Sequence, residues 1–225
     1  CRENLKKGAD LLKLFITPGV PEPASTFVPS FLSLEEISTA VSEGARLGIP
    51  TAAHCIGGQG LKDCIDGGVD VIEHMYMAAE QDVERLAASR CVVDLTSGIF
   101  LDPSREEFLS PANALKVRLN RSRVRENVAR IIRARLPFVL GTDAYHGFLY
   151  REVGYAVELG ADPVTAIQGV TSRAARVCRL EDRIGKLENG MEADIIAVEG
   201  NPLEDVSRLS QVGLVMKGGV VYRQP

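Results

Sequence analysis

Short apolar runs, each closed by a polar side chain, constrain the fold of this chain more than any other feature of its sequence. The runs end at Lys13, His54, His74 and Asp143, and stretches with helical periodicity separate them. Strands that alternate with helices build a parallel sheet. When such a sheet rolls into a barrel, its functional side chains gather at the carboxyl ends of the strands. We therefore expect an α/β chain in which these side chains are candidate site residues.

Helical patterns fill the intervals between the runs. Ser33 with Glu36 predicts a capped helix start, and that helix is expected to stop near Gly48. Further helices are predicted over residues 61–65, 79–89, 113–134, 151–159 and 163–177, with an additional strand over 91–95. Residues 57–60, which are rich in glycine, are expected to form only a turn between strand and helix. The layout corresponds to about the last five βα units of a (β/α)8 TIM-type barrel.

The pattern changes near residue 183. Strands are predicted over 193–198, 212–217 and 220–222, and Gly218 with Gly219 predicts a hairpin turn between the last two. An isolated hairpin is marginal in water, so these strands are expected to pair further. We therefore expect two domains: a partial barrel over residues 1–182, and a C-terminal part of a small β-sandwich over residues 183–225.

Composition argues against several classes of function. The chain has 225 residues, 45% of them hydrophobic and 25% charged, and a net charge of −4, which is typical of a globular protein and gives no nucleic-acid footprint. The arginines within residues 113–134 are therefore expected on a solvated helix face. No apolar run approaches the roughly 18 residues of a membrane span, and the five cysteines show no disulfide pattern. We expect a cytoplasmic protein without nucleic-acid or membrane partners.

The runs have the order and spacing of motifs in a known family. Asp10–Phe15, Ala53–His54, Ile72–His74 and Gly141–Ala144 resemble segments of the amidohydrolase superfamily, in its branch of imidazolonepropionase-like and prolidase-like metal-dependent hydrolases. The tail segment 187–196 is similar to the return of that family's chain into its β-sandwich. Each motif alone is weak, but their common order and spacing are fairly specific.

The resemblance implies a metal site and a reaction. Lys13 corresponds to the lysine that is carboxylated to bridge two metals, His54 and His74 correspond to histidine ligands, and Asp143 corresponds to the ligand that also carries the catalytic proton. Imidazole and carboxylate donors suit one or two divalent ions, zinc first, with manganese, iron or cobalt as alternatives. The implied reaction is hydrolysis of the carbon–nitrogen bond of a small-molecule amide, such as a cyclic amide or a small peptide derivative, by a metal-activated water.

Three further side chains, Tyr76, Tyr145 and His146, follow the ligand positions closely and are expected to contact the substrate. Tyr76 could instead be a packing aromatic, and Tyr145 and His146 could be solvent-facing loop residues. Cys55 directly follows His54, but neighbouring residues of a strand face opposite sides of the sheet. A nucleophilic role for Cys55 is therefore rejected.

The chain departs from the family at its histidines. His54, His74 and His146 are its three histidines, so the His-x-His pair of the family's first strand is absent. The resemblance therefore implies an N-terminally truncated enzyme that begins just before the fourth strand and can lack activity on its own. A lesser departure is Ile16–Gly19, which stands where the family often has a Gly-Gly turn.

Other interpretations of the same residues remain open. Lys13 could form an ordinary ion pair or act as a Schiff-base amine, both histidines could be hydrogen-bonded core residues, and Asp143 could cap the next helix. The chain could also be a non-catalytic half-barrel that complements a missing N-terminal half or associates with a copy of itself, because an open parallel sheet exposes an edge. A homo-oligomer is expected on this ground.

Overall fold

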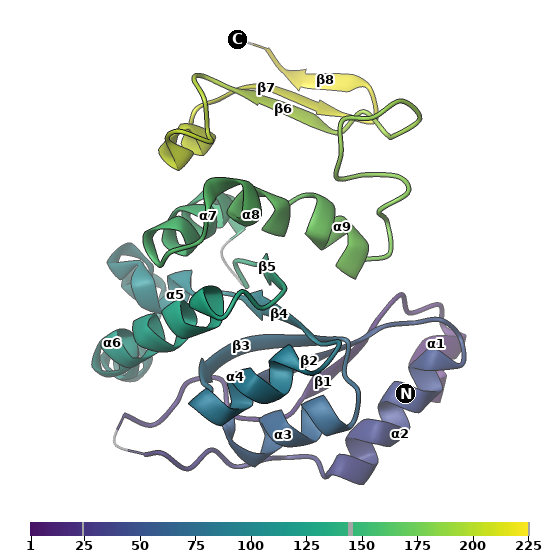
Figure 1. Ribbon diagram of the computed structural model, residues 1–225, viewed down its shortest axis with the longest axis vertical. Coiled ribbons are helices and arrows are strands. Elements are labelled where there is room, and N and C mark those ends of the chain that lie inside the picture. Colours follow the sequence, from purple (N-terminus) through teal and green to yellow (C-terminus); the bar gives the residue numbers. More distant parts are fainter. Residues whose placement is uncertain (24, 144–145, 225) are drawn as a thin grey trace. The chain divides into compact units, whose positions relative to one another are not determined.

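The computed structural model describes residues 1–23, 25–143 and 146–224. The chain divides into two compact units, Cys1–Pro137 and Phe138–Pro225, which are described separately below (Figure 1). The five strands of the larger sheet follow one another in chain order, β1-β2-β3-β4-β5, and the last of them opens the second unit. A sheet of consecutive strands alternating with helices confirms the expected α/β class, with the strand count of about five βα units.

The first unit contains a parallel sheet with helices. Its strands are β1 (Leu12–Phe15), β2 (Thr51–Gly57), β3 (Val71–Met77) and β4 (Val92–Leu95). Its helices are α1 (Arg2–Lys6), α2 (Leu34–Ala45), α3 (Gly58–Asp66), α4 (Glu80–Ala87), α5 (Gly98–Leu101), η1 (Pro103–Phe108) and α6 (Pro111–Arg133). Strand β2 is buried along its whole length, which places the core of this unit at the centre of the sheet.

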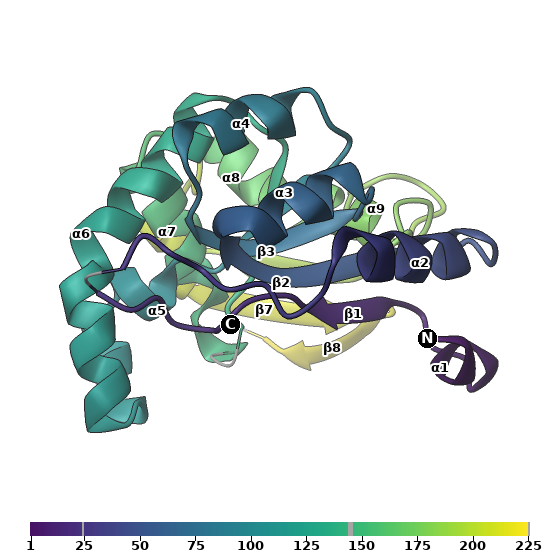
Figure 2. The ribbon, with the colours of Figure 1, turned by 90° about the horizontal axis from the view of Figure 1, so that it is seen from below.

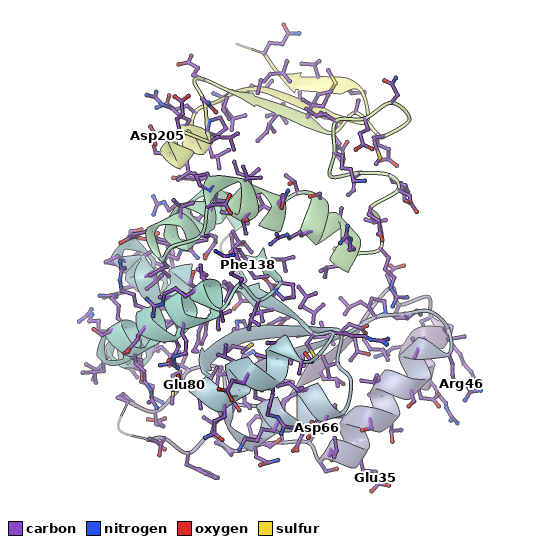
Figure 3. The ribbon with its side chains drawn as sticks, in the orientation of Figure 1. Glu35, Arg46, Asp66, Glu80, Phe138 and Asp205 are labelled. Carbon is purple, nitrogen blue, oxygen red and sulfur yellow. The ribbon has the colours of Figure 1, made fainter. Side chains whose placement is uncertain are left out.

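Helices α2, α3 and α4 lie on one face of strands β1 to β3 (Figure 2). Leu12 of β1 points to this face, because an added Cβ at Gly44 of α2 would lie 3.2 Å from its Cδ1 atom. Charged side chains such as those of Glu35 and Arg46 are exposed at the ends of α2 (Figure 3). Since strand side chains alternate, Lys13 and Phe15 face the opposite side of the sheet, away from these helices.

A local sequence signal accounts for the start of α2, whereas the start of α3 differs from the prediction. Ser33 and Glu36 form the expected capping box at α2: the Glu36 amide donates to Ser33 Oγ at 3.3 Å, and the Ser33 amide donates to Glu36 Oε2 at 2.8 Å. The turn expected over residues 57–60 is wrong, since α3 begins at Gly58 directly after β2. An added Cβ at Gly57 would meet Met77 at 2.8 Å, and one at Gly58 would meet Val28 at 2.9 Å. These glycines therefore serve close packing as well as the sharp change from strand to helix.

The second unit contains the remaining elements. They are β5 (Phe138–Leu140), η2 (His146–Phe148), α7 (Leu149–Glu158), α8 (Pro163–Gly169), α9 (Ser172–Val177), β6 (Ile195–Val198), η3 (Val206–Ser210), β7 (Val212–Lys217) and β8 (Val220–Arg223). The single helix predicted over 163–177 is wrong, because the chain breaks between α8 and α9. Thr171, with φ −128° and ψ −103°, leaves the helical region there, and its hydroxyl donates to the Ile167 carbonyl at 2.8 Å.

Strands β6, β7 and β8 form an antiparallel sheet of three strands. Gly218 and Gly219 both have positive φ, 55° and 79°, as a tight hairpin turn requires. The Gly218 amide donates to Asp194 Oδ1 at 2.7 Å, which ties this turn to the residue just before β6. The hairpin of β7 and β8 is therefore extended by a third strand, β6, as expected for a hairpin that is only marginally stable alone. The domain boundary at 182/183 stays a prediction.

Within the described residues, no helix combines the length and the apolar character needed to cross a bilayer.

Candidate metal-binding site

Side chains from three strands of the first unit meet at the carboxyl ends of those strands. The register pairs Phe15 with His54 and His54 with Glu73, so these side chains lie next to one another across β1, β2 and β3. The rings of His54 and His74 lie 4.5 Å apart between centroids, at an angle of 64°. Lys13 Nζ lies 2.6 Å from Glu73 Oε2, and that oxygen lies 3.8 Å from His74 Nε2. The structure thus brings Lys13, His54 and His74 together, with Glu73 between the amine and the second imidazole.

The backbone of β3 explains how Glu73 and His74 reach the same side. Adjacent residues of a regular strand face opposite sides of the sheet. His74 and Met75 instead adopt the left-handed region, with φ 78° and 53°, which non-glycine residues rarely occupy. Because this change of direction occurs at His74 itself, its ring lies beside His54 although its neighbour Glu73 also points there.

His54 is buried and held from two sides. The Phe15 ring stacks on its imidazole at 4.2 Å between centroids, with 15° between the planes. Its Nε2 atom lies 3.2 Å from the Pro18 carbonyl oxygen. A carbonyl oxygen can only accept, so Nε2 carries a hydrogen, and in the neutral ring Nδ1 then carries the lone pair. The ring therefore offers Nδ1 as its donor atom for a metal.

His74 is buried more deeply. Burial first, and then the electrostatic effect of His54 and Lys13, lower the pKa of His74 to about 3. The ring is therefore neutral at physiological pH, which is the form that binds metals. Its Nδ1 atom lies 2.6 Å from Thr96 Oγ1 and 3.3 Å from the Tyr76 hydroxyl.

Tyr76 points into the protein beside His74. Its hydroxyl donates to the Thr96 carbonyl at 2.9 Å and lies 2.7 Å from Thr96 Oγ1. The Phe100 ring meets the tyrosine ring edge to face at 4.5 Å. The substrate contact expected for Tyr76 stays a prediction, whereas its contact with Thr96 is part of the structure.

Sequence reasoning missed two residues of this cluster. Thr96 directly follows β4, the same strand-end position that selected His54 and His74. The strand-end rule could therefore have found Thr96 had hydroxyl side chains been considered. The strand-end rule did not select Glu73, because the alternation of side chains along a regular strand placed Glu73 on the opposite face of the sheet from His74.

The residues expected after β5 belong to the second unit. Asp143 is exposed and has a positive φ of 56°. Tyr145 lies outside the described residues, and for His146 only the backbone, at the start of η2, is described. The ligand and proton-carrying roles of Asp143 and the substrate contacts of Tyr145 and His146 stay predictions.

The side chains of the first unit fit a divalent metal only in part. Among the described residues, no three His, Cys, Asp or Glu side chains form a group that could hold a metal. The two imidazoles of His54 and His74 are donors that zinc and related ions prefer, whereas a zinc site usually has four ligands. Lys13 can join only after carboxylation turns its cationic amine into an anionic oxygen donor.

The arginines of α6 are held by contacts within the first unit. Arg118 Nε lies 2.5 Å from Glu106 Oε2, Arg121 donates to the Phe100 carbonyl at 2.6 Å, and Arg123 donates to the Ser25 carbonyl at 3.1 Å. These contacts tie α6 to η1, α5 and the loop after β1. They give these arginines a structural role.

Comparisons with known proteins place the chain in a family of similar sequence and fold. The model of the amidohydrolase family matches residues 1–222. The chain is 31% identical to ochratoxinase of Aspergillus niger over 239 residues, which cover all of this chain and 48% of that protein. It is 23% identical to imidazolonepropionase of Kosmotoga olearia over 227 residues, which cover 99% of this chain and 51% of that protein.

Solved structures show the same likeness. A crystal structure of a Xaa-Pro dipeptidase with methionine bound in its active site superposes with a TM-score of 0.86 at 31% identity. The match covers 99% of this chain and 56% of that one. The chain thus spans about half the length of the relatives that it matches.

Proposed function

The chain belongs to the amidohydrolase family, and from this membership we propose that it hydrolyses the carbon–nitrogen bond of a small-molecule amide with the help of a divalent metal. The observation that carries the proposal is the meeting of Lys13, His54 and His74 at the carboxyl ends of three neighbouring strands. The names of the relatives support a hydrolase. The dipeptidase, by its name, acts on an Xaa-Pro dipeptide, and a small amide is the substrate class proposed here.

Each residue has a proposed role. His54 through Nδ1 and His74 through Nε2 would hold the metal, which is zinc in the first place, with manganese, iron or cobalt as alternatives. Lys13 would join them after carboxylation. Asp143 would complete the set and carry the proton to the leaving nitrogen. A metal bound there would supply a water-derived nucleophile near neutral pH and polarise the scissile carbonyl.

Lys13 must change partners on carboxylation. Its amine forms an ion pair with Glu73 at 2.6 Å. A carbamate on Lys13 would be an anion, so it would repel the Glu73 carboxylate at this distance. We expect carboxylation to break this ion pair and to accompany metal binding. The Schiff-base alternative would likewise require Lys13 to leave Glu73.

Substrate contacts and compartment complete the proposal. Tyr145 and His146, which follow Asp143, and Tyr76 would contact the substrate, and the loops around the site would select it. The five cysteines are free thiols, which supports a reducing, cytoplasmic compartment.

Zinc titration by calorimetry, with metal analysis of the dialysed protein, tests the proposal. Because the described residues supply two imidazoles, we expect weak, substoichiometric zinc in the isolated chain. His54→Ala and His74→Ala should each lower the zinc affinity at least tenfold, whereas Glu35→Gln, at the exposed end of α2, should leave it unchanged. Zinc binding that survives both histidine substitutions would contradict the proposal. Borohydride trapping of a carbonyl compound on Lys13 would favour the Schiff-base alternative.

A further inference from the structure

We propose that Thr96 and Tyr76 are positioning residues that hold the His74 ring in one tautomer, with the hydrogen on Nδ1, so that Nε2 presents its lone pair. The proposal concerns the ring and the two hydroxyl groups themselves. Only its consequence for metal binding rests on the proposed function.

The three side chains form a compact cluster of short contacts. Thr96 Oγ1 lies 2.6 Å from His74 Nδ1 and 2.7 Å from the Tyr76 hydroxyl, and that hydroxyl lies 2.9 Å from the Thr96 carbonyl oxygen. All three residues are at most 5% exposed. Buried polar groups at these distances are hydrogen-bonded, so each of these three short contacts should contain a hydrogen. A fourth contact, between the Tyr76 hydroxyl and His74 Nδ1, is longer, at 3.3 Å.

The number of hydrogens available for these three contacts determines which nitrogen of the His74 ring is protonated. The Thr96 carbonyl can only accept, so the Tyr76 hydroxyl donates to it. The Thr96 hydroxyl then supplies the hydrogen for its contact with the tyrosine oxygen. The remaining contact, between Thr96 Oγ1 and His74 Nδ1, must take its hydrogen from the ring. If Nδ1 lacked a hydrogen, the two hydroxyl hydrogens would have to serve all three contacts, and one contact would lack a hydrogen.

The chain of hydrogen bonds from Tyr76 through Thr96 to His74, called the relay below, is held in place by contacts with two helices. Asn127 of α6 donates from its side-chain nitrogen to the Tyr76 carbonyl at 2.7 Å, and both residues are buried. Phe100 of α5 packs edge to face against the Tyr76 ring. The tyrosine is thus fixed at its backbone and at its ring, which leaves its hydroxyl little freedom to turn away from Thr96.

The consequence for the site is that the two histidines present different nitrogens. The Pro18 carbonyl holds the hydrogen of His54 on Nε2, whereas the Thr96 hydroxyl holds that of His74 on Nδ1. A metal between the rings would therefore meet Nδ1 of one ring and Nε2 of the other. Hydrogen bonds to the far nitrogen of a ligating histidine orient the ring and raise its basicity.

Long-range 1H–15N NMR of the metal-free chain, labelled at its three histidines, tests the relay, because protonated and unprotonated ring nitrogens have widely separated 15N shifts. His74→Gln assigns the His74 signals by their loss. We expect Nδ1–H at His74 in the wild-type chain and a shift of population to Nε2–H in Tyr76→Phe, where the Thr96 hydroxyl is released to donate to Nδ1. Thr96→Val should remove the nearer Nδ1 partner and leave the Tyr76 hydroxyl at 3.3 Å, and Thr96→Ser should restore the wild-type signals. Tyr222→Phe, at an exposed tyrosine of β8, is the matched control.

The outcomes separate the relay from the proposed function. An Nε2–H ring in the wild-type chain, or an unchanged tautomer in folded Tyr76→Phe, would overturn the relay. If the relay holds, zinc titration of the same variants should show a 10- to 100-fold loss of affinity in Tyr76→Phe and Thr96→Val. A wild-type chain with the expected tautomer but without zinc affinity would instead overturn the metal site of the proposed function.

Discussion

At the scale of single residues, the His74 imidazole is the side chain whose surroundings most oppose a charge. Burial, the neighbouring His54 and the cationic Lys13 all favour its neutral form. Glu73 Oε2 lies 3.8 Å from His74 Nε2, and Lys13 forms an ion pair with the same oxygen at 2.6 Å. Lys13 and Glu73 thus shape the electrostatics around the His74 ring.

This environment predicts a pH dependence of stability in the metal-free protein. The pKa of His74 is about 3 in the folded chain against 6.5 for an unperturbed histidine, so below pH 6.5 the unfolded chain takes up a proton that the folded chain does not. Stability should therefore fall as the pH falls from about 6.5 towards 3. Between pH 7 and pH 5 the loss from this residue is about 2 kcal/mol in the free energy of unfolding.

Urea unfolding at both pH values measures this loss, with His74→Gln as the comparison. The variant lacks the titrating group, so its free energy of unfolding should fall less on acidification by the stated amount. Equal acid sensitivity of the two proteins would show that His74 is not held neutral by the fold.

At the scale of elements, the cap at the start of α2 could be predicted from the sequence. The capping box of Ser33 and Glu36 satisfies amide groups at the start of α2 that the helix itself leaves free. Ser33→Ala should therefore lower the free energy of unfolding by about 1 kcal/mol. Ser42→Ala, at an exposed position in the last turn of the same helix, should change it by less than about 0.5 kcal/mol. Urea unfolding measures both, and equal losses would contradict the capping role.

The break between α8 and α9 shows where such local signals fail. The predicted helix start at residue 163 agrees with α8, where the Asp162 side chain accepts from the Thr165 amide at 3.1 Å. Nothing in the pattern predicted the end at Gly169. There an added Cβ would already lie 3.4 Å from Leu140, so packing against β5 accounts for the glycine. Thr171 ends the helix through a hydrogen bond whose geometry the sequence does not reveal.

At the scale of the whole molecule, the unpaired edge of strand β1 has the largest consequence for association. In the described part of the chain, β1 pairs with β2 on one side only. Leu11 and Phe15 are 47% and 55% exposed beside that open edge. Unpaired edges with apolar neighbours favour association with another strand. This observation favours a second candidate function, a half-barrel that complements another polypeptide or associates with a copy of itself.

Sedimentation velocity over a concentration series tests self-association. We expect the weight-average mass to rise with concentration in the wild-type chain. Leu11→Lys should suppress the rise, because a charge beside the edge opposes strand pairing. Leu119→Lys, on the exposed face of α6, is the control and should behave as the wild type does. A monomer at every concentration would contradict the second candidate.

The sequence by itself determined the alternation of strands and helices, the hairpin at Gly218, the cap at Ser33 and three of the side chains at the site. These features depend on periodicity and on residues a few positions apart, so a linear pattern records them. Only the tertiary structure decided that Glu73 stands between Lys13 and His74, and that Thr96 contacts His74. These contacts depend on the register of three strands and on a left-handed backbone at His74, which no periodic pattern encodes.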